Sequence, residues 1–164
     1  MIPVSRSILL SILLCFLCTV VCVADVTDLT AGTIQLPDGW TQKRTGTLDS
    51  ERGQLARGDG GLIVHYDIGF LAGMQMSRDK EPECIWYREQ IVHGYLAHIG
   101  LVKTESGREL VVTLVGRGTS RLEAVRQSIA RAPFKYPANF RATVKTDEDV
   151  VDVLLIAMSY EAKP

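Results

Sequence analysis

His65 and Asp67 are the residues of this chain whose types and spacing best suggest chemistry. They lie two positions apart in a β-branched and aromatic run, so on a strand their side chains share one face. A carboxylate that orients an imidazole is the beginning of either a metal site or a general base. Two groups alone specify neither chemistry, and the alternative is a polar pair on the solvent face of a half-buried sheet. We therefore assign no catalytic residue and leave metal binding open.

Cys84 is a second candidate, because a thiol and any of the three histidines could form a nucleophile and base pair. Glu81 and Glu83 lie close to it in the chain, and their negative charges are expected to raise the pKa of the thiol. A raised pKa disfavours the reactive thiolate. We therefore expect an inert or intermolecularly paired thiol at Cys84.

The other histidines and Ser50 give weaker patterns. His93 and His98 are five residues apart, which places them on opposite faces of one strand and makes them poor joint metal ligands. Ser50 follows Asp49 in a glycine-flanked segment that lacks the Gly-x-Ser-x-Gly pattern of a nucleophile elbow. Ser50 is therefore predicted to be a turn residue.

The segment Gly116 to Ser120 joins a predicted strand, Glu109 to Val115, to a predicted helix. Exposed N–H groups at the start of a helix bind anions. Arg121 stands where a dinucleotide fingerprint has its third glycine, and the segment has no Lys-Ser/Thr pair of a phosphate loop. The segment is thus either a site for an anion or carboxylate or a connecting loop with solvated arginines. No cofactor is predicted.

Residues 1–24 have the pattern of a secretory signal peptide. A lone Arg6 precedes a long apolar run that ends in Cys22-Val23-Ala24, a small-residue cleavage site before Asp25. The expected location is therefore secreted or periplasmic, with retention of the segment as an uncleaved anchor as the alternative. Cleavage would leave Cys84 as the sole cysteine and exclude an internal disulfide.

The charge balance limits the classes of partner. Without the signal, which carries one arginine and no acid, 17 basic and 19 acidic residues remain. A slightly acidic chain has neither the basic footprint of a nucleic-acid-binding protein nor a polybasic membrane patch. The expected partner is a protein or small ligand outside the cytoplasm, with no nucleic acid and no stable membrane insertion after cleavage.

The elements that must position these residues follow from residue patterns. Residues 25–33 are polar and are predicted to form a tether, and residues 34–164 to form a single domain. The clearest strand is Leu62 to Ile68, and the glycines of Gly58 to Gly61 predict a tight hairpin turn before it. Asn139 to Val144 alternates as a further strand.

The apolar residues between Ile85 and Val102 fit both a helical and a strand period. Gly94 and Gly100 favour a strand. Leu96 to Lys103 and Glu109 to Val115, joined by a polar turn, predict a second antiparallel hairpin.

Two helices are predicted in the last third of the chain. The first begins at a capping box of Ser120 and Glu123 and ends before Pro133, and the second begins at Thr146, followed by three acidic residues. The expected buried stripe of the second helix is Val150, Val153, Leu154, Ala157 and Met158. Together these elements predict an α+β domain, a mainly antiparallel sheet with one or two helices packed on one face.

Three short motifs carry a resemblance. They are Leu36-Pro37-Asp38-Gly39-Trp40, Tyr66-Asp67-Ile68-Gly69 and Ala138-Asn139-Phe140. With them the chain resembles small uncharacterised secreted bacterial proteins and, more distantly, is similar to PsbP-like domains. The second resemblance implies an antiparallel sheet flanked by helices and a non-catalytic accessory or binding role, and it transfers no functional residue.

Two functions follow as expectations. The first is a non-enzymatic extracytoplasmic binding or accessory domain. The alternative is a small hydrolase or metal-dependent enzyme that uses His65 and Asp67. Convergence of these two side chains with a third ligand in a concave pocket would favour the enzyme, and a flat, open face would favour the binding domain.

Overall fold

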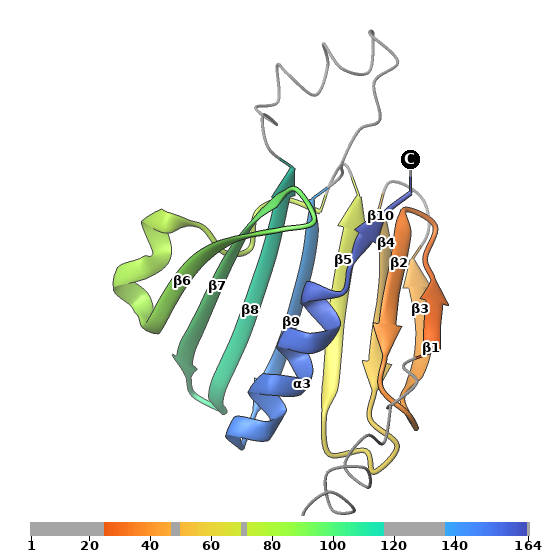
Figure 1. Ribbon diagram of the computed structural model, residues 1–164. Helices are drawn as coiled ribbons and strands as arrows, with labels where there is room; N and C mark the ends of the chain where they lie inside the picture. Colours follow the sequence, from red (N-terminus) through yellow and green to blue (C-terminus); the bar gives the residue numbers. More distant parts are fainter. Residues whose placement is uncertain (1–24, 47–49, 70–71, 117–136, 164) are drawn as a thin grey trace, which may run out of the picture.

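The computed structural model describes residues 25–46, 50–69, 72–116 and 137–163, and strands dominate it (Figure 1). The elements are β1 (Asp25–Asp28), β2 (Gly32–Leu36), β3 (Thr41–Gly46), β4 (Ser50–Ala56), β5 (Ile63–Gly69), the 3-10 helix η1 (Arg78–Glu83), β6 (Cys84–Val92), β7 (Tyr95–Thr104), β8 (Gly107–Gly116), β9 (Ala138–Val144), α3 (Asp147–Met158) and β10 (Glu161–Ala162). None of the described helices is long and apolar enough to cross a membrane.

The strands form two sheets. The large sheet has seven strands in the order β3-β4-β5-β9-β8-β7-β6, and the small sheet has three in the order β1-β2-β10. Every strand pair in both sheets is antiparallel. The predicted α+β class with a mainly antiparallel sheet is therefore confirmed. The helix predicted between Ser120 and Pro133 lies outside the described residues.

The start of the domain differs from the predicted tether. Asp25–Asp28 pairs along its length with β2, and Leu29 is fully buried. Residues 25–33 therefore belong to the folded domain, and the prediction of a polar tether is wrong. A two-stranded pairing uses backbone hydrogen bonds, which polar residues can make as well as apolar ones, so composition alone does not reveal this strand.

The predicted strand between Ile85 and Val102 is a hairpin of two strands, β6 and β7. His93 and Gly94 form its turn, with φ angles of 47° and 80°. Two successive positive φ angles are the geometry of a tight two-residue hairpin turn, which matches the twist of the strands. His93 and His98 are consequently a turn residue and a strand residue, and not two members of one strand.

The β4–β5 and β7–β8 hairpins agree with their predicted turns. Arg57 and Leu62 close the first turn through a backbone hydrogen bond of 3.0 Å, and Thr104 pairs with Gly107 across the second. Ser50, predicted to be a turn residue, is the first residue of β4 and pairs with Gly69. The glycine-flanked segment therefore ends earlier than its composition suggests.

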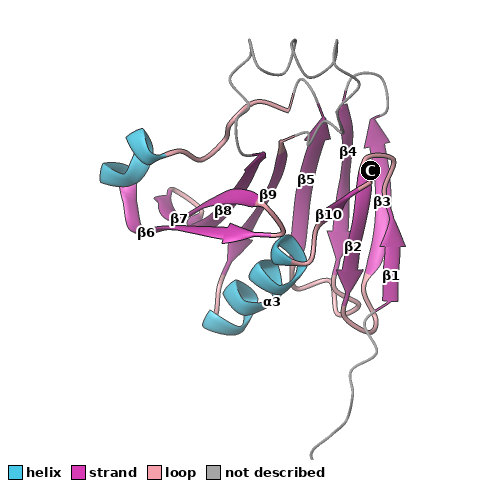
Figure 2. Cartoon of the chain, turned by 45° about the horizontal axis from the view of Figure 1, so that its top comes forward, coloured by secondary structure: helices cyan, strands magenta, loops and turns pink. Residues whose placement is uncertain are grey.

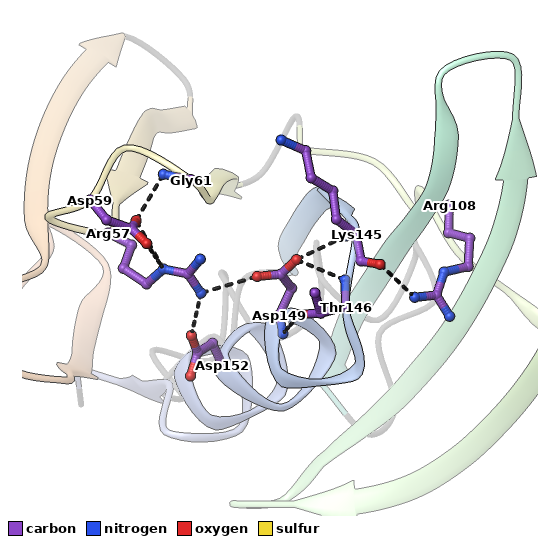
Figure 3. A network of polar contacts seen from close by, with 8 residues as sticks. All are labelled: Arg57, Asp59, Gly61, Arg108, Lys145, Thr146, Asp149 and Asp152. Carbon is purple, nitrogen blue, oxygen red and sulfur yellow. Dashed lines mark hydrogen bonds and ion pairs between the residues drawn. The ribbon is translucent and has the colours of Figure 1, made fainter.

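α3 begins at the predicted Thr146 cap. The Thr146 hydroxyl accepts a hydrogen bond from the Asp149 N–H at 3.1 Å, and the Asp149 carboxylate accepts from the Thr146 N–H at 3.0 Å. This capping box satisfies two of the N–H groups that a helix leaves unpaired at its start. Figure 3 shows that Asp149 also accepts a hydrogen bond from Arg57, with 3.0 Å between Arg57 Nη1 and Asp149 Oδ1. This bond connects the β4–β5 turn to the helix.

α3 contacts β9, β8 and β2, and the large sheet twists strongly beside it (Figure 2). The buried side chains of the helix are Asp149, Val153, Ile156 and Ala157. The predicted stripe is right for Val153 and Ala157, whereas it omits Ile156, and Val150, Leu154 and Met158 are only partly buried. The core residues of the large sheet that belong to the same cluster include Leu55, Val64, Tyr66, Ile99, Val112 and Phe140.

Gly53 shows how closely this face is packed, and it carries a first prediction. It lies directly opposite Tyr66, and a Cβ at Gly53 would come within 2.5 Å of Tyr66 Cζ and 2.6 Å of the Lys43 carbonyl oxygen. Because backbone and a buried ring must both move, Gly53→Ala is expected to lower the free energy of unfolding by about 1 to 3 kcal/mol. Urea denaturation measures this loss. Gly46→Ala is the matched control, since its nearest contact would be 3.6 Å, and equal losses for both variants would contradict the explanation.

Candidate functional site

A continuous row of polar residues crosses the face of the large sheet that is opposite to the buried residues Val64, Tyr66 and Phe140. Side chains alternate between the two faces of a strand, and the register places each member of the row directly opposite the next. The polar row consists of Arg52 on β4, Asp67 on β5, Asn139 on β9, Thr113 on β8, His98 on β7 and Glu89 on β6. It thus spans six neighbouring strands, and we call this side of the sheet the polar face.

The middle of the polar row is buried. Asn139 is 1 % exposed and Thr113 is fully buried, and the Thr113 hydroxyl donates to Asn139 Oδ1 at 2.7 Å. Asn139 Nδ2 donates to the carbonyl oxygens of Ala72 and Gly73 at 3.1 and 3.0 Å. Through these bonds the row anchors the segment that leads from β5 towards η1.

Two further bonds complete this anchorage. The Gln75 N–H donates to Asn139 Oδ1 at 3.3 Å, and the Met76 N–H donates to Thr113 Oγ1 at 2.9 Å. Asn139 therefore bonds through both its amide nitrogen and its carbonyl oxygen. A buried polar network that is satisfied in this way rigidifies its surroundings.

A pocket of about 230 Å³ opens at one end of the polar row. Its polar lining residues include Arg52, His65, Asp67, Gln75, Asn139 and Arg141. His65 and Asp67, the sequence candidates, lie on the face of β5 opposite to its buried residues, as expected for a polar pair on the solvent face, and His65 is exposed. Both residues also line this pocket. The pocket also holds two arginines that the sequence alone did not associate with the pair.

The charges in the pocket are unevenly paired. Arg52 Nε lies 3.2 Å from Asp67 Oδ2, and the Asp67 side chain is only 15 % exposed. Asp67 Oδ1 is enclosed and has no hydrogen-bond partner among the described residues. Arg141 is exposed, lies directly opposite His65, and makes no ion pair with any part of the chain that the structure describes. One guanidinium is thus fixed by a carboxylate and the other is available to a ligand.

The pocket does not supply the third ligand that a metal site needs. Within residues 25–46, 50–69, 72–116 and 137–163, no group of three His, Cys, Asp or Glu side chains is arranged to hold a metal ion. The other polar residues that line the pocket are two arginines, two amides and the hydroxyl residues Thr45 and Tyr66, all of which can donate hydrogen bonds to acceptors.

The other end of the polar row is a compact cluster of Tyr87, His98, Glu89 and Arg78. The Tyr87 hydroxyl lies 2.8 Å from Glu89 Oε1 and 2.6 Å from His98 Nδ1, and Arg78 Nε donates to Glu89 Oε1 at 3.0 Å. An ionised carboxylate only accepts, so the single Tyr87 proton is donated to Glu89 and His98 Nδ1 carries the proton donated to the tyrosine oxygen. Burial and the adjacent Glu89 raise the pKa of Tyr87, which keeps this hydroxyl protonated.

Glu89 in this cluster carries a pH prediction. The Arg78 hydrogen bonds and then the Tyr87 bond lower the pKa of Glu89 from 4.5 to about 2. A carboxyl whose pKa is lower in the folded state stabilises that state above its ordinary pKa, and the contribution disappears as the pH falls towards the folded pKa. The loss therefore occurs between pH 4.5 and about 2. In Glu89→Gln, which cannot ionise there, the free energy of unfolding should fall less steeply across this interval.

Unfolding by urea at a series of acidic pH values measures this slope. Glu105→Gln is the control, because Glu105 is exposed in the β7–β8 turn. A slope in Glu89→Gln equal to that of the unsubstituted protein would contradict a role for Glu89 in acid sensitivity.

Cys84 has the properties of an unreactive thiol. It is a free cysteine, and its Sγ lies 3.4 Å from the Lys80 carbonyl oxygen. Burial, followed by the charges of Glu83 and Glu81, raises the pKa of the Cys84 thiol. The predicted effect of these acidic neighbours is confirmed, and Cys84 has no place in the candidate site.

The remaining sequence candidates contribute nothing to the pocket. His93 lies in the β6–β7 turn, and His98 belongs to the cluster with Tyr87. Gly116 is the last residue of β8, and the rest of the Gly116 to Ser120 segment lies outside the described residues, so its expected anion site is not described.

In comparisons with protein-family models, curated proteins and solved structures, nothing matches the chain significantly.

Proposed function

We propose that this protein is a non-enzymatic extracytoplasmic binding domain and that it binds a small polar ligand in the pocket of Arg52, His65, Asp67 and Arg141. The observation that carries the proposal is the polar pocket beside a buried, hydrogen-bonded anchor, Asn139. Ligand sites combine a concave shape with a few polar groups that are held in place, and rigid supports reduce the cost of binding. A location outside the cytoplasm, which the pattern of residues 1–24 supports, is part of the proposal.

The chemistry of the pocket supports binding over catalysis. His65 and Asp67 share the site with Arg52, Arg141, two amide side chains and the hydroxyl residues Thr45 and Tyr66, and no third metal ligand lies there among the described residues. A general base also needs a positioned group from which it can take a proton.

The expected arrangement of helices on one face of the sheet is also part of this proposal, since it leaves the polar face to the ligand.

A ligand survey with a built-in activity control tests the proposal. The isotope-labelled protein is titrated with small molecules grouped by charge, and backbone amide signals are followed by NMR. We expect one group to give saturable shifts at Arg52, His65, Asp67 and Arg141, while Val26 in β1 stays unchanged. The same samples are kept for a day, and the ligands are then inspected for conversion.

Each outcome decides between the two functions. Saturable binding without conversion supports the binding domain. Conversion of a bound compound that stops in His65→Ala, with the fold retained by circular dichroism, would replace it with the enzyme. The absence of saturable shifts in the pocket with every group would contradict a small-ligand site.

A further inference from the structure

We infer that the pocket selects a small carboxylate that carries a single negative charge, an inference that rests on the proposed binding function. The argument uses the positions of the two arginines, the net charge of the lining residues and the size of the pocket. No metal or covalent step is involved.

The register places His65 between the two arginines. Arg141 on β9 lies directly opposite His65 on β5, and Arg52 on β4 lies diagonally to it, opposite Asp67. Directly opposite Cβ atoms are roughly 5 Å apart and diagonal ones roughly 7 to 8 Å apart, within reach of long side chains. A group that binds above His65 can therefore receive N–H donors from both guanidinium groups. Planar guanidinium groups suit oxyanions, because they donate two parallel hydrogen bonds.

Asp67 makes Arg52 a fixed donor. Its Oδ2 lies 3.2 Å from Arg52 Nε, which leaves the terminal nitrogens of that guanidinium for other acceptors. Arg141 has no such restraint from the described residues and supplies the uncompensated positive charge. Asp67 is therefore a positioning residue, and Arg141 is the residue expected to contribute most to affinity.

The net charge distinguishes between oxyanions. Two arginines and one aspartate give the pocket one net positive charge when His65 is counted as neutral. A carboxylate with one negative charge neutralises it, whereas a phosphate group carries about −1.5 to −2 charges at pH 7 and would leave an excess beside Asp67. Like charges at short distance disfavour binding. The pocket is thus matched to a monocarboxylate.

The size of the pocket limits the rest of the ligand. Its volume of about 230 Å³ is below the roughly 300 to 1,000 Å³ of sites for drug-sized molecules. Gln75, anchored through its N–H by Asn139, lines the same space and offers an amide to a second polar group. A short-chain acid fits this description.

The test uses four probes of similar size: propionate, propanol, propylamine and inorganic phosphate. Each is titrated into the protein at neutral pH and constant ionic strength, with NMR shifts of the pocket amides as the readout. We expect saturable binding of propionate, no saturable shifts with propanol or propylamine, and affinity for phosphate at least about tenfold weaker. The neutral and cationic probes separate recognition of the carboxylate from filling of space.

Two variants locate the recognition. Arg141→Gln keeps hydrogen-bond donors and removes the charge, and it should weaken propionate binding by at least about tenfold, the size expected for a charge-assisted contact. Arg88→Gln is the matched control: Arg88 is an exposed strand arginine on the other face, opposite Ile99, and its substitution should leave affinity unchanged. Both variants should unfold at the same temperature as the unsubstituted protein.

The outcomes separate the two proposals. Equal binding of propanol or propylamine in the pocket, tighter binding of phosphate, or unchanged affinity in Arg141→Gln would overturn carboxylate selection and leave the binding function standing. If all four probes fail to bind while another compound of the survey shifts the pocket amides, carboxylate selection is likewise overturned and the binding function stands. Failure of every compound would overturn both.

Discussion

Asn139→Ala is expected to lower the free energy of unfolding by about 3 kcal/mol. The substitution leaves the Ala72 and Gly73 carbonyl oxygens without their donor and removes the acceptor of the Gln75 N–H and the Thr113 hydroxyl. Buried polar groups that lose a partner cost roughly 1 to 3 kcal/mol each, and part of this is recovered when the segment from Ala72 relaxes towards water. Chemical denaturation measures the total.

Thr143→Ala is the control for this variant, because Thr143 lies on the same strand and the same face but is exposed. We expect a change within about 0.5 kcal/mol there, as for most surface substitutions. The anchored segment should also exchange its amide hydrogens faster in Asn139→Ala. Equal stability losses in the two variants would show that the buried hydrogen bonds of Asn139 contribute no more than an exposed side chain.

Only part of the site is predictable from the sequence, and the position of Asn139 shows why. His65 and Asp67 are identifiable as a pair because alternation along one strand is a local property. Asn139 and Arg141 lie more than seventy positions further along the chain, and their place beside the pair depends on β5 pairing with β9 in one register. A shift by one residue would turn every side chain of a strand to the other face, and no local pattern specifies that register.

The fold shows the same division between local and long-range information. The β4–β5 and β7–β8 turns and the Thr146 cap are predictable, since glycines, short polar turns and capping residues act within a few positions. The pairing of β1 with β2 is not, because Asp25–Asp28 has no apolar periodicity to reveal it. Ile156 is missed for another reason: α3 contacts both β9 and β2, so its buried face is wider than a single stripe.

Asp149→Ala is expected to cost about 3 kcal/mol of unfolding free energy, because this carboxylate connects three parts of the fold (Figure 3). It accepts hydrogen bonds from the Lys145 and Thr146 N–H groups at 2.9 and 3.0 Å and from Arg57 at 3.0 Å. Its side chain is 5 % exposed, so water cannot replace these partners without local opening. Burial is the largest single influence on the pKa of Asp149 and opposes ionisation, yet the combined hydrogen bonds lower that pKa.

Glu148→Ala separates this connection from the simple electrostatic benefit of an acid at a helix start. Glu148 occupies the same first turn and is exposed, so its removal loses only the dipole interaction, roughly 0.3 to 1 kcal/mol. Thermal and urea unfolding of both variants should therefore differ by about 2 kcal/mol or more. The excess arises because Asp149→Ala also removes one of the two α3 carboxylates that bind Arg57, so that only Asp152 still connects the β4–β5 turn to α3, and because the Lys145 and Thr146 N–H groups lose their acceptor. Equal losses in the two variants would mean that the buried hydrogen bonds of Asp149 contribute no more than the exposed carboxylate of Glu148.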